Sequence, residues 1–95
     1  MLFVSRIIWD DWNVAHIARH DVVPEEVEQV CHGKCAVSET YKGGLRGVGP
    51  TAVGRMLTVI LDPENDKGAY YPITARVADR KERKNYSDEV GGEEL

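Results

Sequence analysis

The spacing of apolar residues changes near Gly33 and divides the chain into a helical first part and a strand-rich second part. Before Gly33, apolar positions recur at helical spacings in residues 12–20 and 22–31, and Pro24 suits the first position of the second helix. A short β-branched run over residues 4–10 predicts one strand ahead of both helices. After Gly33, apolar and polar residues alternate, as they do in β-strands.

Three or four antiparallel strands are predicted in the second part, separated by turns and loops. The strand at residues 55–62 is apolar on both faces, which places it in the middle of the sheet. In the strand at residues 69–77, Pro72 has no amide hydrogen and therefore belongs at a bulge or facing an edge. The other two strands are expected at residues 35–41 and 45–51.

A final helix is predicted from Asp79 through Tyr86. Asp79 and Glu82 have the three-residue spacing of a capping box at its start. Residues 87–95 are glycine-rich and acidic, and we expect them to form a flexible tail. The order of elements predicts a single α+β domain over residues 1–86. In it, two N-terminal helices and one C-terminal helix lie on one side of a small antiparallel meander sheet.

Charge is unevenly distributed along this acidic chain. Residues 1–33 hold two basic and six acidic residues, whereas residues 34–86 hold ten basic and six acidic ones, and residues 87–95 add four acids. A basic middle segment in a protein of net charge −4 indicates a ligand or partner surface. The sequence has no apolar run of membrane-spanning length and no secretory signal, so we expect a cytoplasmic protein without a membrane partner.

A zinc site is an alternative for the first part of the chain. His16 and His20 lie four residues apart on one helix face, and Cys31, His32 and Cys35 follow. Cys31, however, completes the apolar stripe of its helix, and the spacing of the two cysteines is wider than in the usual zinc knuckle. We therefore favour reduced, structural cysteines and expect no metal ion or other cofactor.

Three stretches of the sequence resemble the BrnT family of toxins. They are WDDWNVAHIARHDVVPEEVEQV (residues 9–30), YKGGLRGVGPTAVGRMLTVIL (residues 41–61) and ITARVADRKERKNY (residues 73–86). The match extends over about residues 6–86, in the order and spacing of the family. The resemblance implies a RelE-like fold and a ribonuclease that inhibits translation, as the toxin of a type II toxin–antitoxin pair. It also implies a small antitoxin, often of ribbon-helix-helix type, which neutralises the toxin and binds operator DNA in the complex.

RNA cleavage without a metal ion uses the ribose 2′-OH as an internal nucleophile. The enzyme must orient this group, stabilise the pentavalent phosphate and move two protons. Arginine suits the phosphate because its planar fork donates two parallel hydrogen bonds. We hypothesise that Arg76 contacts the scissile phosphate and that the flanking phosphates are bound by Lys42, Arg46 and Arg55, because residues of an antiparallel meander can converge on one sheet face.

The proton carrier is harder to identify from the sequence. Glu82 is either a catalytic base or only the second member of the capping box. Tyr86 or Tyr71 is suited to stack on an RNA base or to donate a proton. A basic helix face is most often a solvated surface, but the resemblance to BrnT favours Arg83 as an RNA contact, and Arg80 less strongly.

A non-enzymatic function is the alternative to a ribonuclease toxin. Many RNA-cleaving toxins of the RelE-like fold are basic, whereas both ends of this chain are acidic. The alternative is a degenerate toxin that acts as a partner- or RNA-binding module. In either case we expect Trp9 and Trp12 to lie in the core or to face the antitoxin rather than to stack on a ligand.

Overall fold

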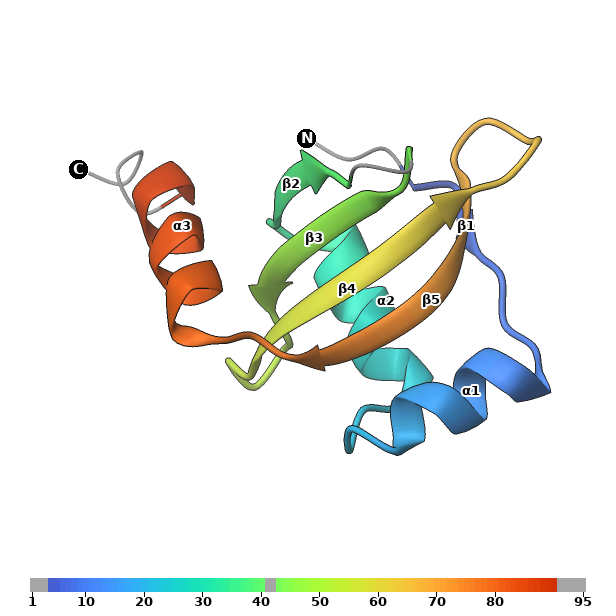
Figure 1. Ribbon diagram of the computed structural model, residues 1–95, viewed down its shortest axis with the longest axis horizontal. Helices are drawn as coiled ribbons and strands as arrows, with labels where there is room; N and C mark the ends of the chain where they lie inside the picture. Colours follow the sequence, from blue (N-terminus) through green and yellow to red (C-terminus); the bar gives the residue numbers. More distant parts are fainter. Residues whose placement is uncertain (1–3, 41–42, 91–95) are drawn as a thin grey trace.

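The computed structural model of the chain describes residues 4–40 and 43–90. Over these residues the chain forms three helices and a five-stranded sheet, which confirms the predicted α+β class (Figure 1). In chain order the elements are β1 (Arg6–Ile7), α1 (Asp11–Ala18), α2 (Pro24–His32), β2 (Ala36–Glu39), β3 (Leu45–Pro50), β4 (Met56–Pro63), β5 (Ala69–Val77) and α3 (Arg80–Val90). No helix within the described ranges has the length and hydrophobicity that a membrane span requires.

The strands lie in the order β1-β5-β4-β3-β2. Strands β2 to β5 are antiparallel neighbours and form the predicted meander. Strand β1 instead pairs in parallel with β5, with Arg6 opposite Ala69, so the sheet is mixed rather than purely antiparallel. The parallel pair is possible because α1 and α2 carry the chain from β1 at one edge of the sheet to β2 at the other (Figure 1).

Strand β4 has the central position that its apolar sequence predicts. Its residues Leu57, Val59 and Leu61 point to one face of the sheet, which we call the inner face, and all three are completely buried. Pro72 also lies as predicted. The pairing of β4 with β5 passes from Thr74 to Pro72 across a register shift, so the missing amide hydrogen falls at a bulge.

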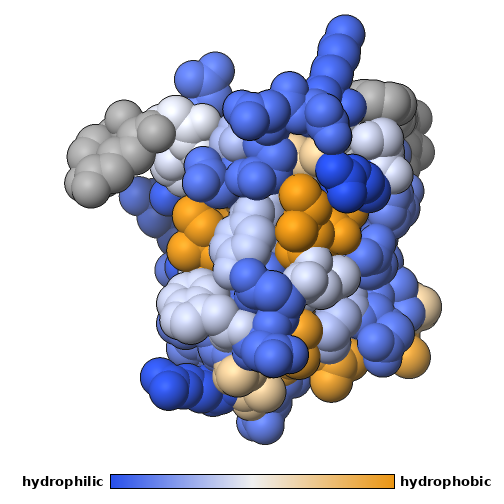
Figure 2. Space-filling model, turned by 90° about the vertical axis from the view of Figure 1, so that its right-hand side faces the viewer, coloured by the Kyte–Doolittle hydropathy of each residue, from blue (hydrophilic) through white to orange (hydrophobic). Residues whose placement is uncertain are grey.

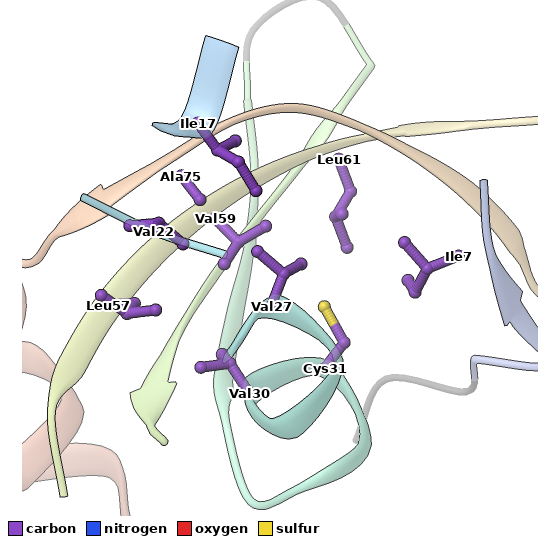
Figure 3. Close-up of a cluster of buried hydrophobic side chains, with 10 residues drawn as sticks. All are labelled: Ile7, Ile17, Val22, Val27, Val30, Cys31, Leu57, Val59, Leu61 and Ala75. Atoms are coloured by element: carbon purple, nitrogen blue, oxygen red, sulfur yellow. The ribbon is translucent and has the colours of Figure 1, made fainter. Parts of the chain in front are cut away.

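Helix α2 packs on the inner face of the sheet and contributes several side chains to the hydrophobic core (Figure 3). Its residues Val27, Val30 and Cys31 form the buried stripe that their spacing predicts. Val23, which shares this spacing, is 48% exposed because it is the N-cap residue, with an extended backbone just before Pro24. The core cluster consists of Ile7, Ile17, Val22, Val27, Val30, Cys31, Leu57, Val59, Leu61 and Ala75.

Helix α1 begins with a reciprocal cap. The Asp10 carboxylate accepts a hydrogen bond from the Asn13 amide at 2.9 Å, and the Asn13 side chain accepts one from the Asp10 amide at 2.9 Å. Asn13 is completely buried, and its side-chain nitrogen donates to the Ile8 carbonyl at 3.0 Å. This buried amide is therefore satisfied, and it fixes the point at which the chain turns from β1 into α1.

Helix α3 lies beside the outer face of the sheet, opposite α1 and α2, and packs next to β2 and β3 (Figure 1). The prediction that all three helices share one side of the sheet is therefore wrong for α3. The physical reason is its composition, because Tyr86 and Val90 are the only apolar residues in the helix, too few to cover a core.

The C-terminal end of α3 also differs from the prediction. The helix continues through Val90, whose side chain is buried, so residues 87–90 belong to the helix rather than to the predicted tail. The helix starts as expected, because the Asp79 carboxylate accepts from the Glu82 amide at 2.8 Å and Glu82 accepts from the Asp79 amide at 2.8 Å. Residues 91–95 lie outside the described part of the chain.

Candidate functional site on the outer sheet face

The outer face of the sheet carries two of the predicted arginines. Arg46 of β3 lies opposite Ile60, and Arg76 of β5 lies opposite Thr58. Because alternate residues of a strand point to opposite faces, these four side chains share the face turned away from the core residue Val59. Arg46 and Arg76 therefore share one sheet face, on either side of β4.

Arg76 and Glu82 form a bidentate ion pair on this face. Nη1 of Arg76 donates to Oε1 of Glu82 at 2.8 Å, and Nη2 donates to Oε2 at 2.9 Å. The Glu82 side chain is 11% exposed, whereas that of Arg76 is 42% exposed, so solvent reaches the pair from the arginine side. Two parallel charge-assisted hydrogen bonds are the geometry that arginine uses for phosphate as well as for carboxylate.

The ion pair and the cap together determine the proton affinity of Glu82. The hydrogen bonds from Arg76 are the largest cause, and with the Asp79 amide they lower the pKa of Glu82 from 4.5 to about 2. A carboxylate with such a low pKa is ionised at neutral pH but has little tendency to take up a proton. Of the two roles considered for Glu82, the geometry therefore favours the capping box over the catalytic base.

We expect the folded protein to lose stability as the pH falls from 4.5 towards 2. Glu82 binds a proton less readily in the folded than in the unfolded chain, so its stabilising contribution is complete above its ordinary pKa of 4.5 and is lost as the pH falls through about 2. Solvent screening limits this contribution to about 1–2 kcal/mol. Thermal denaturation as a function of pH should show a steeper loss for the wild type than for Glu82→Gln, and equal slopes would contradict this assignment.

Thr58 lies beneath the ion pair and is a site residue that the sequence did not reveal. It is 1% exposed, and within the described residues its hydroxyl oxygen has no hydrogen-bond partner. The hydroxyl is nevertheless close enough to Glu82 to contribute to its lowered pKa. In the sequence, Thr58 is simply a polar residue of an alternating strand, and no local signal shows that it faces an ion pair.

A small groove separates α3 from the hairpin of β2 and β3 and has a volume of about 100 Å³. It brings Arg46 and Tyr86, two of the predicted RNA contacts, to one place beside Glu82. Asn85 also lines it and was not predicted, because its position on the sheet-facing side of α3 depends on where that helix packs. The groove is lined by Ala36, Val37, Ser38, Arg46, Val48, Glu82, Asn85, Tyr86 and Glu89.

The other predicted residues of α3 have mixed roles. Nη1 of Arg83 donates to the Ala78 carbonyl at 2.8 Å, which braces the start of the helix. The Tyr86 hydroxyl donates to the Lys34 carbonyl at 3.1 Å and joins α3 to the segment before β2. Arg80 is exposed at the first position of the helix. Arg80 thus lies at the surface, whereas Arg83 and Tyr86 also help to hold α3 in place.

Arg55 is directed away from the outer face. Its Nη1 donates to both carboxylate oxygens of Glu26 at 3.0 Å and to the Asp21 carbonyl at 2.6 Å. These partners belong to α2 and to the loop before it, on the inner side of the sheet. The structure therefore does not bring Arg55 together with Arg46 and Arg76, and its geometry is that of a residue that ties the start of β4 to the helices.

A further predicted residue, Tyr71, is bound elsewhere. The Tyr71 hydroxyl donates to the two carboxylate oxygens of Asp10, at 3.1 and 2.9 Å, and thus binds the N-cap of α1. Lys42 lies outside the described part of the chain. The described site therefore consists of Arg46, Arg76 and the neighbouring residues of α3.

The histidines and cysteines of the first part lie in separate environments. The His16 ring stacks on Trp12, with ring centroids 4.9 Å apart, and meets His20 edge-on at 5.7 Å. Cys31 packs in the core, where burial raises the pKa of its thiol to about 12, and Cys35 is a free, half-buried thiol. Within the described ranges, no three His, Cys, Asp or Glu side chains gather closely enough to hold a metal ion.

A second concave surface, of about 400 Å³, lies along α1 and holds none of the predicted RNA contacts. Trp9, at its edge, packs against the core and donates from Nε1 to Glu28 at 2.9 Å, whereas Trp12 is 56% exposed. On the side of the molecule where β1 and α1 lie, apolar side chains reach the surface between hydrophilic ones (Figure 2). Only Trp9 therefore packs against the core, and Trp12 is at the surface.

Comparison with known proteins does not assign the chain to a family. No family model matches it, and no curated protein is significantly similar to it. The likeness to the BrnT toxins therefore rests on the three sequence stretches quoted above.

Proposed function

We propose that this protein is the toxin of a type II toxin–antitoxin pair and that it cleaves RNA through attack of the 2′-OH, without a metal ion. The observation that carries the proposal is the placement of Arg46 and Arg76 on one sheet face, beside the groove under α3. Two guanidinium groups on a common face suit an extended polyanion. The resemblance to BrnT suggests the reaction class.

In this proposal Arg76 binds the scissile phosphate and Arg46 binds a flanking one. The guanidinium of Arg76 offsets the additional negative charge that develops on the pentavalent phosphate. Tyr86 lines the groove, and in this proposal its ring stacks on an RNA base. Because the pKa of Glu82 is only about 2, the mechanism depends on orientation of the 2′-OH and on electrostatics rather than on a strong base.

The partners follow from the same proposal. The substrate is RNA, and its cleavage inhibits translation in the cytoplasm. A small antitoxin, of ribbon-helix-helix type, neutralises the protein and supplies the contact with operator DNA.

One observation favours a second function, that of a non-enzymatic RNA- or partner-binding module. Arg76 is already neutralised by Glu82, and this carboxylate is too weak a base to activate a hydroxyl efficiently. A protein that had lost catalysis would still offer Arg46, Arg80 and the groove to a polyanion.

Growth after induction in the absence of the antitoxin distinguishes the two functions. We expect the intact protein to arrest growth and to degrade cellular RNA, and we expect the double variant Arg46→Ala/Arg76→Ala to be harmless at equal expression. An intact, folded protein that is harmless and binds RNA without cleaving it would overturn the toxin in favour of the binding module. A folded protein that neither cleaves nor binds RNA would overturn both the toxin and the RNA-binding module.

A further inference from the structure

Three hydrogen-bond donors already converge on a single anionic group at the centre of the candidate site. The Glu82 carboxylate accepts from Nη1 and Nη2 of Arg76 and from the Asp79 amide, at 2.8 to 2.9 Å. A fourth donor, the hydroxyl of Thr58, is 1% exposed and lies close enough to the same carboxylate to help lower its pKa. An arginine fork, a backbone amide and a hydroxyl form the donor set of an oxyanion site.

We propose that this donor set is a phosphate-binding site and that the Glu82 carboxylate is an internal competitor that fills it when no RNA is bound. The inference rests on the proposed function, because it makes Arg76 available to an RNA phosphate only after Glu82 has left. Thr58 belongs to the same donor set, because its buried hydroxyl lies close enough to the carboxylate to help lower the pKa of Glu82. A carboxylate and a phosphate are both oxyanions that accept from such donors, so a phosphate can take the place of Glu82.

Displacement of the competitor is energetically accessible because few side chains of α3 are buried. Most of its side chains are exposed. Among the described residues its anchors include the ion pair of Glu82, the hydrogen bonds from Arg83 to Ala78 and from Tyr86 to Lys34, and the buried side chain of Val90. A polar helix of 11 residues has little stability of its own. Elements with few buried contacts open at low cost, so withdrawal of Glu82 does not require the domain to unfold.

The functional consequence is a protein whose principal phosphate contact is closed at rest. RNA must compete with a carboxylate that is tethered next to Arg76. The apparent affinity of the protein for RNA is therefore its intrinsic affinity multiplied by the fraction of molecules in which Glu82 is withdrawn. Arg46 on the same face is exposed and can bind a neighbouring phosphate first. Glu82 is therefore a gating residue, and the strength of its pair with Arg76 sets the activity of the free protein.

Binding of an RNA oligonucleotide with 2′-O-methyl groups, which cannot be cleaved, measures this competition directly. We expect Glu82→Gln to bind it about tenfold more tightly than the wild type, because the competing charge is removed while the glutamine oxygen still caps the Asp79 amide. The gain should disappear in the double variant Arg76→Ala/Glu82→Gln. Circular dichroism and thermal denaturation of each variant verify that α3 and the sheet are folded.

The matched control is Asp88→Asn, which makes the same change of charge on the same helix. Asp88 is exposed, lies six residues beyond Glu82 in the helix and pairs with Lys84 at 3.0 Å. We expect this variant to change RNA affinity by less than about twofold, the size of a screened surface charge effect. A gain equal to that of Glu82→Gln would show a general charge effect and would overturn the inference.

The outcomes separate this inference from the proposed function. If the wild type cleaves RNA in an Arg76-dependent way but Glu82→Gln binds no more tightly, the inference is overturned and the toxin function stands. If Glu82→Gln gains affinity through Arg76 but no variant cleaves RNA, the phosphate site stands and the ribonuclease is overturned.

Discussion

Replacement of Arg76 by alanine is expected to lower the rate of RNA cleavage by about 10²–10³-fold, the usual loss when a preorganised donor to a transition-state oxyanion is removed. Arg76 is the outer-face residue whose two donors act in parallel, and it lies between the sheet and the start of α3. The measurement is single-turnover cleavage of a synthetic RNA at saturating protein, because this isolates the chemical step from binding. A rate within about threefold of the wild type would remove Arg76 from the mechanism.

The single substitution has a structural side effect that needs a control. Without Arg76, the Glu82 carboxylate, whose side chain is only 11% exposed in the wild type, loses its main partner, which destabilises the start of α3. The double variant Arg76→Ala/Glu82→Ala removes both charges and thus this penalty. If cleavage is lost equally in the single and double variants while both remain folded, the loss is catalytic. Recovery of cleavage in the double variant would show that the single substitution acted through misfolding.

Replacement of Val59 by alanine is expected to lower the free energy of unfolding by about 2–3 kcal/mol, through lost burial and the cavity left behind. Val59 lies at the middle of the central strand, opposite Gly47 on one side and Ala75 on the other, and is completely buried under α2 (Figure 3). For a domain of this size such a loss lowers the melting temperature by roughly 10–20 °C.

The matched control for Val59 is Val53→Ala, the same chemical change in an exposed turn. The Val53 side chain is 89% exposed, so its truncation removes almost no buried surface. We expect it to change the free energy of unfolding by less than about 0.5 kcal/mol. Urea denaturation of both variants tests the pair, and equal destabilisation would contradict the assigned core.

Features fixed by neighbouring residues were predictable from the sequence. Asp79 and Glu82 stand three apart and form their cap with no help from the rest of the fold. The apolar run of β4 identified the central strand, and the missing amide of Pro72 required a bulge. The shared face of Arg46 and Arg76 followed from strand alternation in an antiparallel meander.

Features that depend on long-range packing were not predictable. The two-residue strand β1 pairs in parallel with β5, more than sixty positions away, and no local pattern specifies that partner. The few apolar residues of α3 indicate that it does not cover the core, but the groove it forms with β2 and β3 depends on how the helix packs, so Asn85 could not be assigned to the site. Arg55 and Arg46 are both arginines of predicted strands and cannot be told apart from the sequence. The partner of Arg55, however, is Glu26 of α2, 29 positions earlier.

The most direct test of the ribonuclease mechanism compares two synthetic RNAs in the presence of a metal chelator. The first is unmodified, and the second carries a single 2′-deoxyribose at the position where the first is cut. If the 2′-OH is the nucleophile and Arg76 stabilises the phosphate, the protein cuts the first RNA, leaves the second intact at that position and produces a 2′,3′-cyclic phosphate end. Equal cleavage of both RNAs, cleavage only when a metal ion is supplied, or no cleavage of either RNA by a folded protein would contradict the mechanism.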